Sequence, residues 1–332
     1  MWSHLRGPTA LPDTTSLATE LAERIAETGP ISIAAYMGAA NAAYYGSRDP
    51  LGAKGDFITA PEISQMFGEL IGLWCADLAR RAGTAAAHYV ELGPGRGTLA
   101  KDAMRAASRH GWMPPVHFVE TSPVFAARLT EQFPDADIHT GIDSLPTDAP
   151  LLIVANEFFD ALPIHQYEMT AHGWRERRVG HNDERGFFAT TGQDLADAYV
   201  PKGLRRAPTG SIWEANHASA AMIAAIGPRI APQGGAILAI DYGHAEPGLG
   251  DTLQALRAHE TADPFARPGE QDLTAHVDFS SLAAAGRAAG LSIAGPTTQG
   301  ALLGGLGLGP RAQSLAAANP DQASELAAAV QR

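Results

Sequence analysis

Two carboxylates directly follow one of the most apolar runs in the chain. The segment "ANEFFDALP" comes after "PLLIV" and contains Asn156, Glu157 and Asp160. In an open α/β sheet, side chains placed immediately after a buried strand lie at the edge where such sheets bind ligands. Carboxylates in that position can hold a cationic group and accept a proton from it. Asn156, Glu157 and Asp160 are therefore the candidate catalytic residues.

A purely structural explanation of this segment is also open. Asp160 would then cap a turn before Pro163, and Phe158 and Phe159 would be ordinary core residues. The explanation is weakest for Glu157, because that residue follows the strand immediately.

A glycine-rich turn lies earlier in the chain. In "VELGPGRGTLAKD", Gly93, Gly95 and Gly97 stand between a predicted strand and a predicted helix, where glycine lets the backbone approach a ligand closely. The dinucleotide fingerprint needs a further glycine at position 98, which is Thr98 here. The pattern therefore disfavours NAD. A second alternative is that the glycines serve only a tight turn.

Two acids accompany the glycine loop. Glu91 lies two residues before the first glycine, where it would repel a pyrophosphate but attract the ammonium group of an amino acid. Glu120 ends the next predicted strand, about twenty residues past the loop, where a carboxylate can accept hydrogen bonds from both ribose hydroxyls. These acids favour a ligand that has an adenosine and a cationic amino-acid group but no diphosphate. S-adenosylmethionine has this composition. We therefore expect Glu91, the three glycines and Glu120 to bind this cofactor.

A methyl donor above the strand ends would place Asn156 and Glu157 opposite the transferable methyl group. Their position resembles that of the Asn-Pro-Pro-aromatic sequence of amino-group methyltransferases, with Glu157 in place of the first proline. If the acceptor is a guanidinium, the carboxylates have a clear role, because they can localise its charge and leave one nitrogen free to attack. Glu157, supported by Asp160 or Asp241, is suited to that role.

The elements around these residues indicate an α/β fold. From residue 88 onwards, short apolar strands alternate with amphipathic helices, which is typical of a mostly parallel sheet with helices on both faces. The sequence predicts strands beginning near residues 88, 116, 136, 151 and 235, and helices over 98–111, 124–133 and 214–231.

The rest of the chain is predicted to add N-terminal helices and a β-hairpin to this sheet. Residues 14–46 indicate two helices broken at "TGP", and a glycine-rich connection then leads to a helix whose start is marked by Thr59 and Glu62, the pattern of a capping box. Residues 164–210 contain two alternating segments around a polar turn, which predicts a β-hairpin at the sheet edge or over it. We divide the chain into an N-terminal helical segment with a lid loop, 1–83, and a cofactor-binding domain with this insertion, 84–332.

Composition limits the classes of function. The net charge of −12 argues against broad binding to nucleic acids or anionic membranes. Cys75 lies in an apolar series with helical spacing, which predicts a buried thiol rather than a nucleophile. The histidines are scattered, and His276 and Asp278 are better explained by a strand end and a helix cap, so no metal site is predicted. Because the N-terminal residues lack the pattern of a signal or transit peptide, the expected location is cytoplasmic.

Six segments resemble, in order, the signature blocks of the MidA-like family of S-adenosylmethionine-dependent methyltransferases. They are "YYGSRDPLGAKGDFITAPEISQMFGELIGLW", "VELGPGRGTLAKD", "VETSP", "ANEFFDALP", "IDYG" and "GEQDLTAHVDFSSL". "QGALLGGLGLGPR" resembles the C-terminal block of the same family. The family includes a mitochondrial protein arginine methyltransferase that acts in the assembly of respiratory complex I.

This resemblance implies a class I methyltransferase fold with added N-terminal helices. It implies that Asp56, Thr59 and Glu62 close over the methionine end of S-adenosylmethionine. It further implies a protein arginine N-methyltransferase, with a complex I subunit as the protein substrate. The missing transit-peptide pattern departs from the mitochondrial members and points to a bacterial protein.

Two other functions remain open at this point. One is an assembly chaperone for complex I that keeps the methyltransferase fold but has little or no turnover, and the other is an NAD-dependent oxidoreductase. The expected partners are a protein substrate and, as a further candidate, a second copy of the chain; neither nucleic acid nor membrane insertion is expected.

Overall fold

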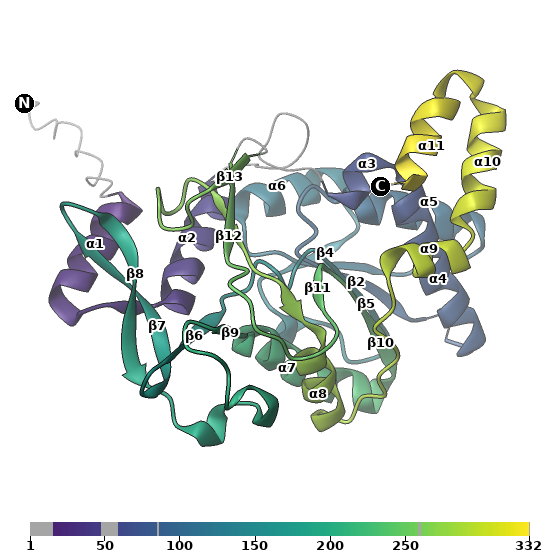
Figure 1. Cartoon of the computed structure of the whole chain (residues 1–332). Helices are drawn as coiled ribbons and strands as arrows, with labels where there is room; N and C mark the ends of the chain where they lie inside the picture. Colours follow the sequence, from purple (N-terminus) through teal and green to yellow (C-terminus); the bar gives the residue numbers. More distant parts are fainter. Residues whose placement is uncertain (1–15, 48–58, 85, 258–259, 332) are drawn as a thin grey trace, which may run out of the picture.

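A five-stranded parallel sheet forms the middle of the molecule in the computed structural model, which describes residues 16–47, 59–84, 86–257 and 260–331 (Figure 1). Its strands are β2 (His88–Leu92), β3 (Val116–Val119), β4 (Asp137–His139), β5 (Leu151–Asn156) and β10 (Gly235–Ile240), and their order is β10-β5-β2-β3-β4. The chain runs outward from β2 to β4 and then returns to β5 on the other side of β2. Sheets of this kind bind ligands where the strand order reverses in this way.

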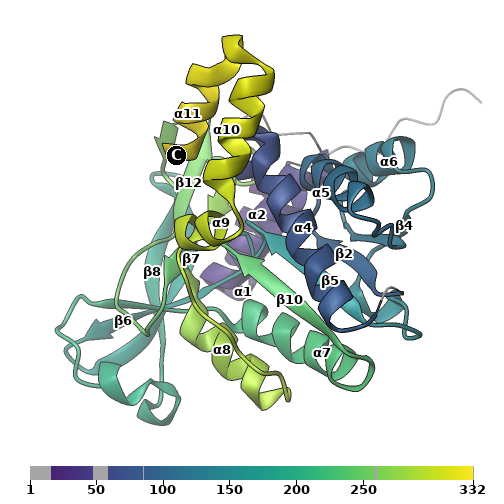
Figure 2. The same cartoon turned by 90° about the vertical axis from the view of Figure 1, so that its right-hand side faces the viewer.

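Helices cover both faces of the sheet, as the alternation of elements predicts (Figure 2). α4 (Gln65–Arg81) and α5 (Thr98–Arg109) share one core with Tyr89, while α7 (His217–Gln233) and α8 (Phe279–Ala288) share the opposite core with Val90. Successive residues of a strand point to opposite faces, so β2 contributes to both cores. Cys75 is fully buried in the α4 core, and burial raises the pKa of its thiol. The α/β fold and the buried thiol are thus confirmed.

The insertion forms a separate antiparallel sheet (Figure 1). Its strands are β1 (Ile31–Ser32), β6 (His165–Thr170), β7 (Gly173–Asn182), β8 (Gly186–Asp194) and β9 (Ile212–Ala215). The predicted hairpin is present as β7 and β8, but β7 also pairs with β6 and with β1 from the N-terminal segment. Of the two placements predicted for the hairpin, pairing at the edge of the parallel sheet was therefore wrong. Apolar residues of both segments, among them Tyr36, Ile164 and Val179, form one buried cluster that holds this sheet against the N-terminal helices.

The remaining elements surround these two sheets. Helices α1 (Leu17–Thr28) and α2 (Ile33–Ser47) are separated at "TGP" as predicted, and α6 (Pro123–Gln132) follows β3. The other elements are α3 (Ala60–Ile63), β11 (Gly243–His244), β12 (Gln254–Arg257), β13 (Glu260–Ala262), β14 (Asp272–Thr274), β15 (Val277–Asp278), α9 (Gln299–Gly305), α10 (Leu308–Ala318), α11 (Ala323–Gln331) and single turns at Ile142–Ser144, Asp197–Tyr199, Lys202–Leu204 and Pro320–Gln322. No helix in the described part of the chain is long and apolar enough to cross a membrane.

The helix after the glycine-rich connection differs from its prediction. Thr59 does precede a helix, α3, but its side chain makes no capping hydrogen bond, and α3 has only four residues. Ser64 interrupts the chain in extended conformation and caps α4 by accepting a hydrogen bond from the N–H of Met66 at 3.2 Å. The predicted capping box is therefore wrong, because Glu62 binds other residues. α4 shares the core of the parallel sheet, and the division of the chain at residue 83 stays a prediction.

Candidate active site

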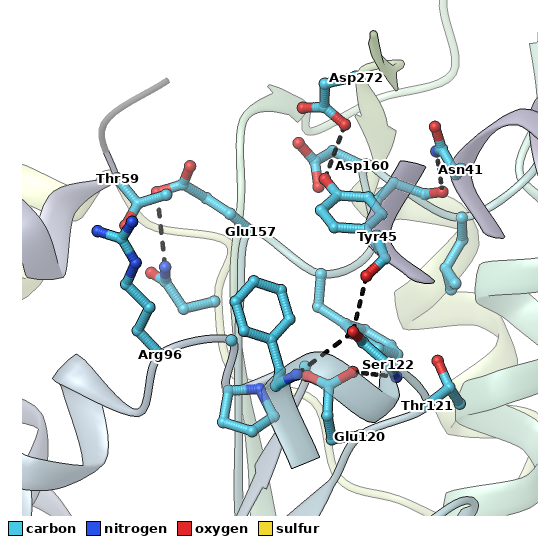
Figure 3. Close-up of a pocket in the computed structure, with 18 of the residues that line it drawn as sticks. Asn41, Tyr45, Thr59, Arg96, Glu120, Thr121, Ser122, Glu157, Asp160 and Asp272 are labelled. Atoms are coloured by element: carbon cyan, nitrogen blue, oxygen red, sulfur yellow. Dashed lines mark hydrogen bonds between the residues drawn. The ribbon is translucent and has the colours of Figure 1, made fainter. Parts of the chain in front are cut away.

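A cavity of about 760 Å³ lies at the carboxyl ends of β2, β3 and β5 (Figure 3). Its volume falls within the range of roughly 300–1,000 Å³ that is usual for small-molecule sites. The predicted site residues that line it are Thr59, Glu62, Glu91, Gly93, Gly95, Glu120, Asn156, Glu157 and Asp160. Residues predicted from segments far apart in the sequence therefore meet in one cavity. Asp56 lies outside the described residues.

The three glycines of the loop have different roles. All have positive φ, between 53° and 72°, a region that side chains other than glycine rarely adopt. Gly93 and Gly95 line the cavity, whereas Gly97 is not among its lining residues and precedes α5. A Cβ atom on Gly97 would lie 2.7 Å from the Phe133 ring. The prediction that Gly97 binds the cofactor directly is therefore not supported; Gly97 shapes the turn that begins α5.

Glu120 is fixed to the glycine loop by the backbone. Its Oε1 accepts a hydrogen bond from the N–H of Ser122 at 2.7 Å, and the N–H groups of Gly95 and Thr121 also hydrogen bond its carboxylate. Burial nevertheless raises the pKa of Glu120 above its ordinary value. The carboxylate is thus held at a defined place at the end of β3, facing the cavity, as the ribose-binding prediction requires.

Glu91 lies on the α4 side of the cavity. Its Oε2 accepts a hydrogen bond from the Tyr89 hydroxyl at 2.8 Å, and burial raises the pKa of Glu91 to about 8. A cationic ligand strongly stabilises the ionised form of such a buried carboxylate, because the charge of the ligand compensates for the lost hydration. Its position supports the expectation that it attracts an ammonium group.

Glu62 and Thr59 also line the cavity. Glu62 Oε1 accepts a hydrogen bond from the Thr98 hydroxyl at 2.6 Å, and its Oε2 lies 3.8 Å from the Arg96 guanidinium. Thr98, the residue that departs from the dinucleotide fingerprint, therefore connects α3 to the start of α5. These contacts explain why Glu62 does not complete a capping box with Thr59.

Glu157 has an unusual backbone conformation. Its φ is 47°, and a residue other than glycine in this region costs about 1–3 kcal/mol. Its Oε1 accepts hydrogen bonds from the N–H of Ala60 at 3.4 Å and from the Asn156 side chain at 3.5 Å. Burial, and then the neighbouring Asp160 carboxylate, raise the pKa of Glu157 to about 6. The hydrogen bond from Ala60 holds the carboxylate at the start of α3, and Figure 3 shows it beside Thr59.

Asp160 and Asp241 have separate functions. Asp160 is 5% exposed, lines the cavity, and its Oδ1 has no hydrogen-bond partner among the described residues. Asp241 instead accepts hydrogen bonds from the N–H groups of Phe159 and Asp160 at 3.0 and 3.2 Å and is absent from the cavity lining. Burial raises the pKa of both acids. Of the two acids predicted to support Glu157, Asp160 therefore lines the cavity, whereas Asp241 holds the loop that carries Asp160.

The structural explanation of "ANEFFDALP" holds for one of its two aromatic residues. Phe159 is fully buried in the core, as that explanation states. Phe158 lines the cavity and packs against Gly93, on which a Cβ atom would lie 2.9 Å from the Phe158 ring.

Several lining residues were missed by the sequence analysis. Asn41, Tyr45 and Asp272 face the cavity from α2 and β14 (Figure 3), and Tyr242 follows β10. The only available signal was that Tyr45, Tyr242 and Asp272 lie inside segments that carry the family resemblance. Their side chains have no periodic or spacing pattern of their own.

Metal-dependent chemistry has no support in the described part of the chain. No group of three His, Cys, Asp or Glu side chains there could hold a metal ion. Asp278 accepts hydrogen bonds from the N–H groups of Ser280 and Ser281 at 3.0 and 3.1 Å, which confirms its predicted role as the cap of α8.

Comparisons with known proteins agree with this site. The family of S-adenosyl-L-methionine-dependent methyltransferases matches residues 70–297, which contain the glycine loop and the "ANEFFDALP" segment. The chain is 36% identical to protein arginine methyltransferase NDUFAF7, mitochondrial, of Danio rerio, over 92% of this chain and 79% of the relative. It is 33% identical to the Drosophila melanogaster homologue, over 87% of this chain and 74% of the relative.

A crystal structure of a Burkholderia thailandensis protein bound to S-adenosyl-homocysteine shares the fold. It has a TM-score of 0.82 and 26% identity, with 95% of this chain and 87% of that chain covered. The cofactor of this chain is therefore S-adenosylmethionine, which fits the positive-φ glycines and the two buried acids better than a dinucleotide does. The chain belongs to the family of S-adenosyl-L-methionine-dependent methyltransferases.

Proposed function

We propose that this enzyme is a protein arginine N-methyltransferase. The observation that supports it most strongly is the strained Glu157, whose carboxylate is held at the cavity beside Asn156 and Asp160. Backbone strain is retained where the surrounding structure needs a side chain in one place, and active sites are where such residues gather. The relatives named protein arginine methyltransferase supply the substrate class.

The chemistry explains why acids are needed. Arginine is protonated at any working pH, and its delocalised charge leaves no nitrogen strongly nucleophilic. S-adenosylmethionine would supply the methyl group from its sulfonium and leave as S-adenosylhomocysteine, whose sulfur keeps the electron pair of the broken carbon–sulfur bond. Glu157 would localise the guanidinium charge on the nitrogens that it contacts, so that the remaining nitrogen forms the new bond to carbon. That nitrogen then loses a proton, which a carboxylate with a pKa of about 6, such as Glu157, can accept.

The cofactor would occupy the half of the cavity formed by the glycine loop. In this proposal Glu120 binds the ribose hydroxyls and Glu91 attracts the ammonium group, while Gly93 and Gly95 allow close approach of the backbone. Thr59 and Glu62 would close the methionine end, with Glu62 held in place by Thr98 and Arg96.

Cofactor binding is expected to release a proton near neutral pH. Glu91 has a pKa of about 8 and is therefore mostly protonated at about pH 7, whereas a bound ammonium would stabilise its carboxylate and lower that pKa. Up to about one proton should leave at pH 7, and none above roughly pH 9, where the group is already ionised. Calorimetry of S-adenosylmethionine binding in buffers with different ionisation enthalpies measures this release.

The Glu91→Gln variant provides the control for this experiment. It keeps the size of the side chain and removes the titratable group, so its binding heat should not depend on the buffer. Equal proton release in wild type and in Glu91→Gln would contradict the role given to Glu91.

The acceptor protein in this proposal is a subunit of respiratory complex I, and the proposed location is the cytoplasm of a bacterial cell. The family resemblance of the sequence blocks is the support for the acceptor protein. Association of two copies of the chain belongs to the same set of proposals, and size-exclusion chromatography with light scattering tests it directly.

The decisive test is the identity of the methylated residue. The purified enzyme is incubated with radiolabelled S-adenosylmethionine and the recombinant complex I subunit, and the product is hydrolysed for amino-acid analysis. Methylarginine supports the proposal. Methyllysine as the only product would contradict it, and cofactor binding with no transfer would favour the assembly chaperone instead.

A further inference from the structure

Tyr242 and Asp160 are bound to each other at the cavity. Both residues line it, and the Tyr242 hydroxyl donates a hydrogen bond to the Asp160 carboxylate. Asp160 is buried, whereas Tyr242 is partly exposed. In the proposed function the acceptor binds beside Glu157 and Asp160, in the half of the cavity away from the glycine loop, the acceptor half. A hydrogen bond to Asp160 therefore acts on a group that would touch the acceptor.

Two sets of contacts fix the backbones of Tyr242 and Asp160 relative to each other. Asp241 accepts hydrogen bonds from the N–H of Asp160 at 3.2 Å and from the N–H of Tyr242 at 3.0 Å. The connection between β14 and β15 contacts both residues as well. The N–H of Ala275 donates to the Asp160 carbonyl at 3.0 Å, and the N–H of Val277 donates to the Tyr242 carbonyl, also at 3.0 Å. The fold itself thus brings the two side chains together.

The Tyr242 ring packs against His276, which lies in the same connection. The two rings meet edge to face, with centroids 5.7 Å apart and planes at 84°. Burial, and then the charge of Asp160, raise the pKa of Tyr242 far above its ordinary value. The hydroxyl therefore keeps its proton and serves the carboxylate as a hydrogen-bond donor.

Asp160 needs such a donor to carry its charge. Burial raises the pKa of Asp160 to about 6, and the hydrogen bond from Tyr242 is the largest of the effects that lower this pKa. The titratable groups that face Asp160 are Glu157 on the same loop, Asp241 after β10, and Tyr45 on α2 with its hydrogen-bond partner Asp272. These neighbours supply no positive charge. A hydrogen bond to the charged form of a carboxyl group favours that form, which is the contribution of Tyr242.

We propose that Tyr242 is a positioning residue of the acceptor site, whose hydroxyl orients Asp160 and stabilises its negative charge for the cationic group of the acceptor. The inference rests on the proposed function for the place of the acceptor. It predicts that the effect of removing the hydroxyl depends on pH, because a sufficiently high pH ionises Asp160 without the hydrogen bond.

The test measures the binding of a charged and a neutral probe at two pH values. N-acetyl-arginine N-methylamide and its citrulline counterpart are titrated by calorimetry into the full-length protein saturated with S-adenosylhomocysteine, at about pH 7 and about pH 9.5. The arginine side chain is charged at both values, so only the protein changes its protonation. Wild type should bind the arginine probe at least about tenfold more tightly than the citrulline probe at both.

Tyr242→Phe removes the hydroxyl and keeps the ring that packs on His276. At about pH 7 Asp160 should then be largely protonated, and affinity for the arginine probe should fall at least about tenfold. At about pH 9.5 the affinity should return to within about threefold of wild type, because Asp160 is ionised again. Affinity for the citrulline probe should stay within about twofold of wild type throughout. A residue that only supports packing would show no such recovery with pH.

Three companion variants separate the hydroxyl from the carboxylate. Asp160→Asn cannot ionise, so it should bind the arginine probe weakly at both pH values. The double variant Asp160→Asn, Tyr242→Phe should bind it no more weakly than Asp160→Asn does, because the hydroxyl acts through the carboxylate. Tyr199→Phe makes the same chemical change at a tyrosine that is 76% exposed and not among the cavity-lining residues, and it should bind both probes as wild type does. Thermal unfolding checks the fold of each variant.

Each outcome decides the proposal. A Tyr242→Phe protein with wild-type affinity for the arginine probe at about pH 7 overturns it, as does a loss that persists at about pH 9.5 or a wild type without preference for arginine over citrulline. If wild type methylates arginine in the subunit but Tyr242→Phe binds the probe normally, this inference fails and the proposed function stands. If wild type methylates only lysine, yet the loss in Tyr242→Phe recovers with pH, the role of Tyr242 stands and the proposed function fails.

Discussion

Glu157→Gln is expected to lower methyl transfer to the acceptor subunit by about a hundredfold or more, while cofactor affinity stays within about threefold of wild type. The amide keeps the size of the side chain and can still accept the hydrogen bond from the N–H of Ala60, so the local fold is preserved. It loses the negative charge that localises the guanidinium. Radiolabelled methyl transfer and calorimetry with S-adenosylmethionine, on the same preparation, separate the two effects.

Two companion variants test the alternative that Glu157 is structural. Glu184→Gln, at the exposed β7–β8 turn, makes the same chemical change away from the cavity and should leave turnover unchanged. Glu157→Gly should lose turnover and yet unfold at an equal or higher temperature, because glycine adopts a φ of 47° without strain. If Glu157→Gln retains wild-type turnover, the carboxylate is structural, and the interpretation of this segment as the acceptor site has to be abandoned.

Gly95→Val is expected to abolish measurable cofactor binding, a loss of at least about a hundredfold in affinity, while the protein remains folded. The φ of Gly95 is 53°, which a β-branched side chain avoids, and the N–H of Gly95 is one of the groups that hold the Glu120 carboxylate. The substitution therefore moves the loop and the ribose-binding acid together. Calorimetry with S-adenosylmethionine and S-adenosylhomocysteine measures the loss, and circular dichroism checks the fold.

Gly210→Val is the matched control for this variant. Gly210 has a φ of 87° and no atom within 4 Å of an added Cβ, so the substitution strains the backbone without touching the cavity. It should unfold at a lower temperature but bind the cofactor normally. Tight cofactor binding by Gly95→Val would show that the loop does not contact the ligand.

The parallel sheet could be predicted because its evidence is local. Apolar runs such as 88–92 and 151–156 are buried on both faces, and the amphipathic segments between them can only form covering helices. Glu91, Glu120, Asn156 and Glu157 lie on β2, β3 and β5 or immediately after these strands, so a parallel sheet brings them to one edge. The cofactor half of the cavity therefore follows from strand order and from position along each strand.

The tertiary structure decided the features that depend on residues far apart in the chain. The insertion forms its own sheet because β7 pairs with β1, about 150 residues away by the sequence numbers of the two strands. Glu62 binds Thr98 and Arg96 instead of its own helix start, because those partners lie within reach only in the folded chain.

In the acceptor half of the cavity, too, some features could be predicted from the sequence and others depend on the tertiary structure. The sequence by itself determined the α/β sheet, the glycine loop and the acids at the strand ends, because each depends on neighbours within one or two elements. Only the tertiary structure decided that Asp272 and Tyr45, 227 positions apart, share a hydrogen bond beside Asp160, and that Asp241 holds the loop instead of facing the ligand. Such contacts leave no periodic pattern in the sequence, since they arise where separate elements pack against one another.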